Sequence, residues 1–74
     1  MSVADLMREY LGGEPNIVRV QPCIARLRVE VKDPGLVDPR GLRAVGAHGV
    51  VIAGNIVQVV VGKQADQLAP LISQ

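Results

Sequence analysis

The run from Pro22 to Val29, with the sequence PCIARLRV, contains the residues whose types and spacing could do chemistry. Cys23 is the only cysteine of the chain, and Arg26 and Arg28 follow it closely. A cationic setting favours the thiolate form of cysteine, which is a nucleophile. Guanidinium groups match the oxygen geometry of a phosphoryl group and bind it in bidentate fashion. A thiol beside two arginines is therefore a candidate phosphoryl carrier, with Cys23, Arg26 and Arg28 as its site residues and the backbone amides around Cys23 as further donors.

An alternating pattern indicates how these side chains are positioned. From position 25 onward, apolar residues at 27, 29 and 31 alternate with Arg26, Arg28, Glu30 and Lys32. This pattern predicts a strand with one buried and one solvated face, on which the two arginines share a side and can both approach Cys23. The alternative is an ordinary solvated face with surface ion pairs, each worth about 0–1 kcal/mol.

The rest of the chain predicts a small α+β fold. Apolar spacing and a capping box predict a first helix over about 2–11, ended by glycines, and an extended segment follows over about 16–21. Asp38 and Pro39 are an N-cap and first helical residue for a short helix to about 45, despite Gly41 inside it. Residues 49–53 and 56–61 form a hairpin around Gly54-Asn55. A third helix follows Gly62, although Pro70 could kink or end it. The economical arrangement is a four-stranded antiparallel sheet with three helices packed on one face, in the order α-β-β-α-β-β-α.

Composition excludes several classes of protein. Seventy-four residues with 49% hydrophobic content suffice for a single domain, 1–74. The net charge of +1 is interspersed, and the chain has one Tyr and no Phe or Trp, which is not the pattern of a general nucleic-acid binder. One cysteine cannot form an internal disulfide, and no apolar run approaches the ~20 residues of a membrane span. We expect a cytoplasmic protein without a signal peptide.

Several segments together resemble a known family, the enzyme IIB domain of the bacterial sugar phosphotransferase system, of the glucose and N-acetylglucosamine type. The most specific part is the cysteine followed by the paired arginines of an Arg-Leu-Arg motif. The glycine-containing segments are weaker signals alone but occur in the right order. The resemblance covers nearly the whole chain and is carried by residues 11–13, 16–17, 23–29, 46–51 and 57–62.

The resemblance implies a function. Cys23 would accept a phosphoryl group from a phosphohistidine on a IIA protein or domain and pass it to a sugar bound by a membrane IIC domain. Arg26 and Arg28 would stabilise the group, and the backbone of Ile24 and Ala25 would bind it. Ala25 stands where many members have Thr, so one hydroxyl that could hydrogen-bond the group is missing. We expect no cofactor and no nucleic-acid partner, a monomeric isolated domain, and a location at the inner face of the membrane through IIC.

Other interpretations of the same residues stay open. A lone cysteine is often a small buried hydrophobe, in which case the chain could be an α+β interaction or nucleic-acid-binding module. A redox-sensing thiol is a third hypothesis, although no resolving cysteine is present. His48 is expected to be a surface loop residue, because its Gly-Ala-His-Gly setting supplies no orienting partner, and one His with one Cys does not predict a metal site. Pro22 and Ile24 flank the thiol as expected docking contacts.

Overall fold

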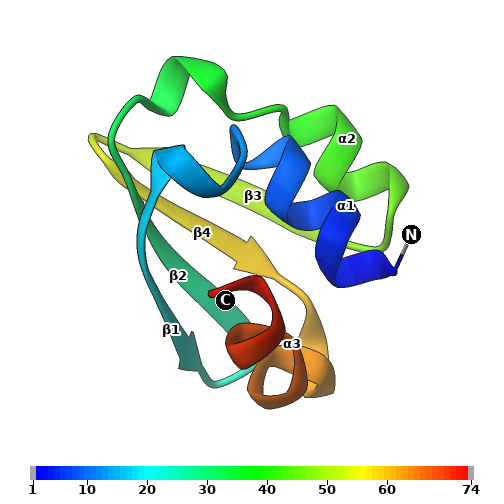
Figure 1. Ribbon diagram of the computed structural model, residues 1–74. Coiled ribbons are helices and arrows are strands. Elements are labelled where there is room, and N and C mark those ends of the chain that lie inside the picture. The colour runs from blue at the N-terminus through cyan, green and yellow to red at the C-terminus, as the bar shows by residue number, and fades with distance from the viewer. Residues whose placement is uncertain (1, 74) are drawn as a thin grey trace.

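The computed structural model describes residues 2–73 and has seven regular elements in the order α-β-β-α-β-β-α (Figure 1). Short 3₁₀ helices precede β1, follow β2 and precede α3, at Glu14–Asn16, Pro34–Leu36 and Gly62–Gln64. The main elements are α1 (Val3–Tyr10), β1 (Ile17–Cys23), β2 (Arg26–Val31), α2 (Pro39–Ala44), β3 (Gly49–Ala53), β4 (Ile56–Val60) and α3 (Ala65–Ile72).

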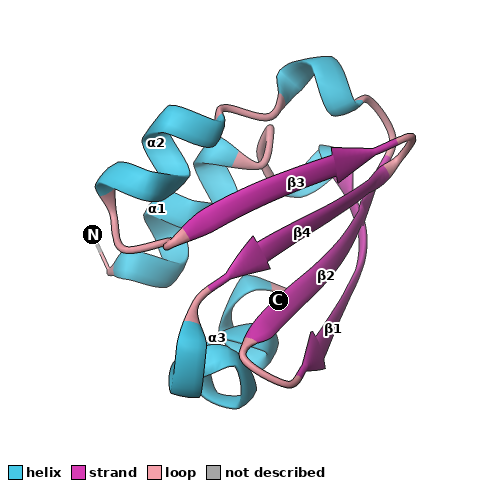
Figure 2. Cartoon of the chain, turned by 180° about the vertical axis from the view of Figure 1, so that it is seen from behind, coloured by secondary structure: helices cyan, strands magenta, loops and turns pink. Residues whose placement is uncertain are grey.

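The four strands form one antiparallel sheet in the order β1-β2-β4-β3, which confirms the predicted fold. One face of the sheet is covered by the helices and the other is open, as Figure 2 shows from the open side. The alternation in β2 decides which side chains are buried, because successive side chains point to opposite faces. Leu27, Val29 and Val31 are almost completely buried toward the helices, together with Val57 and Val59 of the neighbouring β4.

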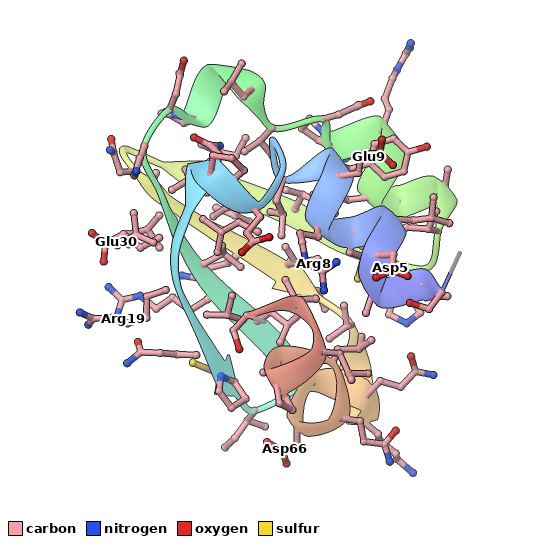
Figure 3. The ribbon with its side chains drawn as sticks, in the orientation of Figure 1. Asp5, Arg8, Glu9, Arg19, Glu30 and Asp66 are labelled. Carbon is pink, nitrogen blue, oxygen red and sulfur yellow. The ribbon has the colours of Figure 1, made fainter. Side chains whose placement is uncertain are left out.

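Arg8 links two helices of this layer, α1 and α3. Its guanidinium forms an ion pair with Asp5 on the same helix, with Nη1 and Oδ1 3.0 Å apart. The same side chain crosses to the end of α3, where Nε donates to the carbonyl of Ile72 at 3.1 Å and Nη2 donates to the carbonyl of Leu71. Figure 3 shows Arg8 and Asp5 on the side of α1 near α3. This bridge holds α3 against α1.

Two details differ from the expected boundaries. The first strand extends to Cys23 instead of ending near 21, and the second begins at Arg26, so only Ile24 and Ala25 remain for the turn. Pro70 lies inside α3 without ending it, since the helix continues to Ile72. Among residues 2–73, no helix combines the length and apolar character needed to cross a membrane.

Candidate functional site

The site predicted from the sequence is a two-residue hairpin turn at one end of the sheet. Cys23 is the last residue of β1 and pairs directly with Arg26, the first residue of β2. The thiol-bearing residue is exposed, so the interpretation of Cys23 as a buried core residue is wrong. Ile24 at the tip is 96% exposed, and Pro22 is exposed as well. The tip of the turn is therefore apolar and lies beside an accessible thiol.

Ala25 gives this turn its shape. Its φ of +61° lies in the left-handed region, and no other non-glycine residue between positions 2 and 73 has a positive φ. This conformation costs an L-residue roughly 1–2 kcal/mol. It is held because the carbonyl oxygen of Ala25 accepts two backbone hydrogen bonds, from Val61 at 3.0 Å and Gly62 at 2.9 Å. Strained backbone of this kind persists where the surroundings over-determine it, which occurs often at functional sites.

The backbone N–H groups of Ile24 and Ala25 have no backbone acceptor within the described part of the chain. Both residues are exposed, so these donors remain available to a ligand at the turn. Free backbone amides near a nucleophile are suitable donors for the oxygens of an anionic group. The turn therefore offers a thiol and two amides in consecutive residues.

The two arginines lie on the open face of the sheet, as the alternation predicts. Residues opposite each other on antiparallel strands share a face, and the register places Cys23 opposite Arg26 and Gln21 opposite Arg28. Arg26 is therefore the direct neighbour of Cys23, and Arg28 lies one pair further along. The Nη1 atom of Arg26 donates to Oε1 of Gln58 on β4 at 3.0 Å.

The side chains of the two arginines are not gathered around the thiol. Arg26 is engaged with Gln58, while Arg28 lines a separate hollow on the open face. Both are long and exposed, so rotation about side-chain bonds can carry a guanidinium toward Cys23 without moving the backbone. The structure thus brings Arg26 and Cys23 together by register, and brings Arg28 only to the same face.

A second set of residues at the thiol could not be found from sequence spacing. A shallow pocket beside Cys23 is lined by Gly62, Lys63, Ala65 and Asp66 in addition to the turn. Lys63 adds a cation to the site, and Asp66 belongs to the first turn of α3, at the end of the molecule seen in Figure 3. These residues approach Cys23 because α3 packs against β1. The only signal in the sequence for this part of the site was the glycine at position 62. In the structure, the φ of +70° at Gly62 redirects the chain after β4.

His48 lies before β3, at the same end of the sheet, and is exposed as predicted. Its backbone N–H donates to the carbonyl of Val60 at 2.7 Å, which anchors the loop to β4. Its Nε2 atom lies 4.0 Å from the point where a side chain on Gly62 would begin. Within residues 2–73, no group of three or more His, Cys, Asp or Glu side chains is arranged to hold a metal ion.

Comparison with known proteins points to one family. The family model for the phosphotransferase system EIIB matches residues 7–38, which run from α1 through the Cys23 hairpin to the loop before α2. The N-acetylglucosamine-specific EIIB component of the phosphotransferase system of Streptomyces coelicolor is 54% identical over 68 residues, which cover 92% of this chain and 88% of that protein.

Two further relatives are much longer proteins. The glucose-specific EIICBA component of Staphylococcus saprophyticus is 52% identical over 58 residues, covering 78% of this chain and 9% of that protein. The glucoside-specific EIICBA component of Staphylococcus carnosus is 44% identical over 71 residues, covering 92% of this chain and 10% of that protein. The chain thus spans about a tenth of each EIICBA relative.

A solved structure has the same fold. The crystal structure of one domain of the phosphotransferase system IIabc component from Clostridium difficile superposes with a TM-score of 0.78 at 26% sequence identity. The match covers 90% of this chain and 70% of that domain. Sequence and structure therefore lead to the same group of proteins.

Proposed function

The chain belongs to the EIIB family of the phosphotransferase system, whose members are phosphoryl carriers, and we propose that Cys23 is the residue that carries the phosphoryl group. The observation that supports this assignment is the exposed thiol at the end of β1, directly opposite Arg26 and followed by two free backbone amides. It is also the only thiol in the chain.

The proposed reaction has two transfers. In the first, the thiolate of Cys23 attacks the phosphorus of a phosphohistidine on a IIA partner whose other ring nitrogen is protonated. An S–P bond forms, the N–P bond breaks with its electron pair passing to the ring nitrogen, and the imidazole leaves as a neutral ring that keeps its proton. In the second, a sugar hydroxyl attacks the same phosphorus; an O–P bond forms, the S–P bond breaks, and the hydroxyl proton passes to a base. Cys23 is then again a thiolate and can accept the next group.

The neighbouring groups have the task of balancing charge. Phosphoryl transfer depends mostly on positioning and electrostatic stabilisation. We assign binding of the phosphoryl oxygens to the N–H groups of Ile24 and Ala25 and to the guanidinium of Arg26. Arg28 approaches from the next pair along the same face when its side chain turns toward Cys23. Ala25 supplies no hydroxyl, so this binding rests on backbone amides and guanidinium groups.

The proposed partners follow from the family and from the fused relatives, whose names combine the C, B and A components in one protein. We infer a IIA protein or domain as donor and a membrane IIC domain as the site of the sugar acceptor, with Pro22 and Ile24 in the contact surface. The sugar is of the glucose or N-acetylglucosamine class, as in the names of two relatives. Residues 1–74 then act as one IIB domain on the cytoplasmic side of the membrane.

The experiment is sugar phosphorylation by membranes that contain the IIC component, with a phosphorylated IIA protein as donor. The wild-type chain should support formation of sugar phosphate, and Cys23→Ala should support none. Arg26→Lys should slow the reaction, because a point charge replaces the planar fork. Arg40→Lys, at an exposed position of α2, is the matched control. Equal rates for the wild type and Cys23→Ala would refute the assignment.

A further inference from the structure

A second hollow lies on the open face of the sheet, one residue pair beyond Cys23. It is lined by Arg19, Gln21, Arg28, Glu30 and Ile56, from three neighbouring strands. The register pairs Arg19 with Glu30 and Gln21 with Arg28, so these four side chains form a compact square on one face. Figure 3 shows Arg19 and Glu30 projecting on the side of the sheet away from the helices.

The two arginines of this hollow keep their donors free. Among residues 2–73 the only ion pair is that of Arg8 with Asp5, and neither Arg19 nor Arg28 donates a side-chain hydrogen bond to another described residue. Arg26, by contrast, is bound to Gln58. By the register, Arg19 and Arg28 occupy diagonal corners of this square, and an anion placed between two guanidinium groups can use the bidentate donors of both.

We propose that the hollow of Arg19 and Arg28 binds the phosphate group of a small phosphate monoester of the sugar phosphate class. The phosphate would lie between the two guanidinium groups. The hollow measures about 110 Å³, well below the range of ~300–1,000 Å³ for sites that enclose a small molecule, and it is open to solvent. It has room for the phosphate group, while the sugar of a monosaccharide phosphate would lie across the neighbouring side chains of the open face.

The remaining lining residues favour a sugar phosphate over bare phosphate. The carboxylate of Glu30 accepts hydrogen bonds from hydroxyl groups, and the amide of Gln21 both donates and accepts them. Ile56 adds an apolar surface for the C–H face of a sugar ring. Glu30 also weakens the attraction for a bare anion, because it lowers the local charge from two positive groups to a net of one. The set of side chains thus has a phosphate end and a hydroxyl end.

This site has a regulatory consequence that rests on the proposed function. Gln21 lies two residues before Cys23, about 7 Å along an extended strand, and Arg28 is shared between the hollow and the proposed phosphoryl site. A sugar phosphate bound by Arg19 and Arg28 would hold Arg28 away from Cys23. The sugar phosphate formed in the second proposed transfer would then slow phosphoryl transfer by Cys23, because it competes for the guanidinium of Arg28.

The test is a titration of the ¹⁵N-labelled chain with glucose-6-phosphate, inorganic phosphate and glucose, followed by amide chemical shifts at fixed ionic strength. We expect glucose-6-phosphate to bind several-fold more tightly than inorganic phosphate, with shifts concentrated at Arg19, Gln21, Arg28 and Glu30, and glucose alone to bind not at all. Arg19→Gln should weaken the binding of glucose-6-phosphate at least tenfold. Arg40→Gln makes the same charge change on α2 and should change the affinity for glucose-6-phosphate by less than twofold.

Further variants separate this proposal from general charge effects and from the proposed function. Glu30→Gln should reduce the preference for glucose-6-phosphate over inorganic phosphate. Equal weakening by Arg19→Gln and Arg40→Gln, or equal affinity of the wild type for the two phosphates, would overturn the assignment. Cys23→Ser should lose phosphoryl transfer and keep the binding. If the wild-type chain binds glucose-6-phosphate but accepts no phosphoryl group, the proposed function and its regulation are refuted. The proposal that the hollow binds a sugar phosphate would still stand.

Discussion

The backbone N–H of Gly62 donates a 2.9 Å hydrogen bond to the carbonyl oxygen of Ala25. This bond joins the turn after Cys23 to the segment that leads from β4 into α3. Both residues have a positive φ, +61° for Ala25 and +70° for Gly62, so both ends of the bond depend on left-handed backbone. The conformation of the turn is thereby coupled to the position of Lys63 and α3 beside the thiol.

The left-handed Ala25 predicts a stabilising substitution. Ala25→Gly removes the steric cost of positive φ, roughly 1–2 kcal/mol, and adds an entropic cost of roughly 0.5–1 kcal/mol from the more flexible unfolded chain. We expect a net gain of about 0.5–1 kcal/mol in the free energy of unfolding, measured in urea. Ala53→Gly, within β3, is the control and should lose stability. A loss at Ala25 equal to that at Ala53 would show that the turn carries no backbone strain.

Asn16 predicts a large loss of stability. It is the buried polar residue of the described chain, at 4% exposure. Its Nδ2 donates to the carbonyls of Leu11 and Asp33, and its Oδ1 accepts from the N–H of Asp33. Asn16→Leu leaves these backbone groups without partners, at about 1–3 kcal/mol for each one left buried. We expect a loss of at least about 2 kcal/mol in urea unfolding. Asn55→Leu, at an exposed turn, should cost less than half as much.

Adding a methyl group at Gly41 is expected to lower the stability of the fold. Glycine inside a helix costs about 1 kcal/mol relative to alanine, so helix propensity alone would make Gly41→Ala stabilising. A Cβ at this position would, however, lie 2.3 Å from the Tyr10 ring. Overpacking typically costs 1–3 kcal/mol, and we expect a net loss of stability. The double variant Gly41→Ala, Tyr10→Leu should recover part of the lost stability. A Gly41→Ala variant as stable as the wild type would show that the Tyr10 ring moves freely.

Asp5 is expected to make a pH-dependent contribution to the stability of the fold. The hydrogen bond from Arg8, followed by those from Ser2, lowers the pKa of the Asp5 carboxyl below its ordinary value of 3.8. A lowered folded pKa means that this carboxylate stabilises the fold above about pH 4, and that the contribution is lost as the pH falls through the folded pKa. Asp5→Asn should therefore be less stable than the wild type at pH 7, with the difference shrinking below pH 4. Glu9→Gln, on the same helix, is the control. A difference independent of pH would contradict the assignment.

The fold was predictable where it depends on local patterns. The alternation at residues 26–31 is sufficient to predict β2 and the common face of Arg26 and Arg28, because side chains alternate along any strand. The Asp38-Pro39 start of α2 and the Gly54-Asn55 turn follow from local capping and turn preferences in the same way. The last two residues of β1 were missed, because Pro22 and Cys23 break the pattern of a strand although they lie on an edge strand, where proline is tolerated.

The site was predictable only in part, for a topological reason. Cys23, Arg26 and Arg28 are close in the sequence, and their relation follows from one hairpin. The contact of Arg26 with Gln58 requires β4 to lie beside β2, and the approach of Lys63 to the thiol requires α3 to pack on β1. Neither follows from spacing, because both join distant parts of the chain. The same holds for the meeting of Arg28 with Ile56 on the open face.

The most direct test of the carrier role is the intact mass of the chain after incubation with a phosphorylated IIA protein. We predict that the wild type gains one phosphoryl group, that fragmentation assigns it to Cys23, and that addition of the sugar with IIC-containing membranes removes it. Cys23→Ser, in which the thiol alone is replaced by a poorer nucleophile, should gain none under the same conditions. A full phosphoryl adduct on Cys23→Ser, or an adduct of the wild type that maps to His48, would contradict the central claim.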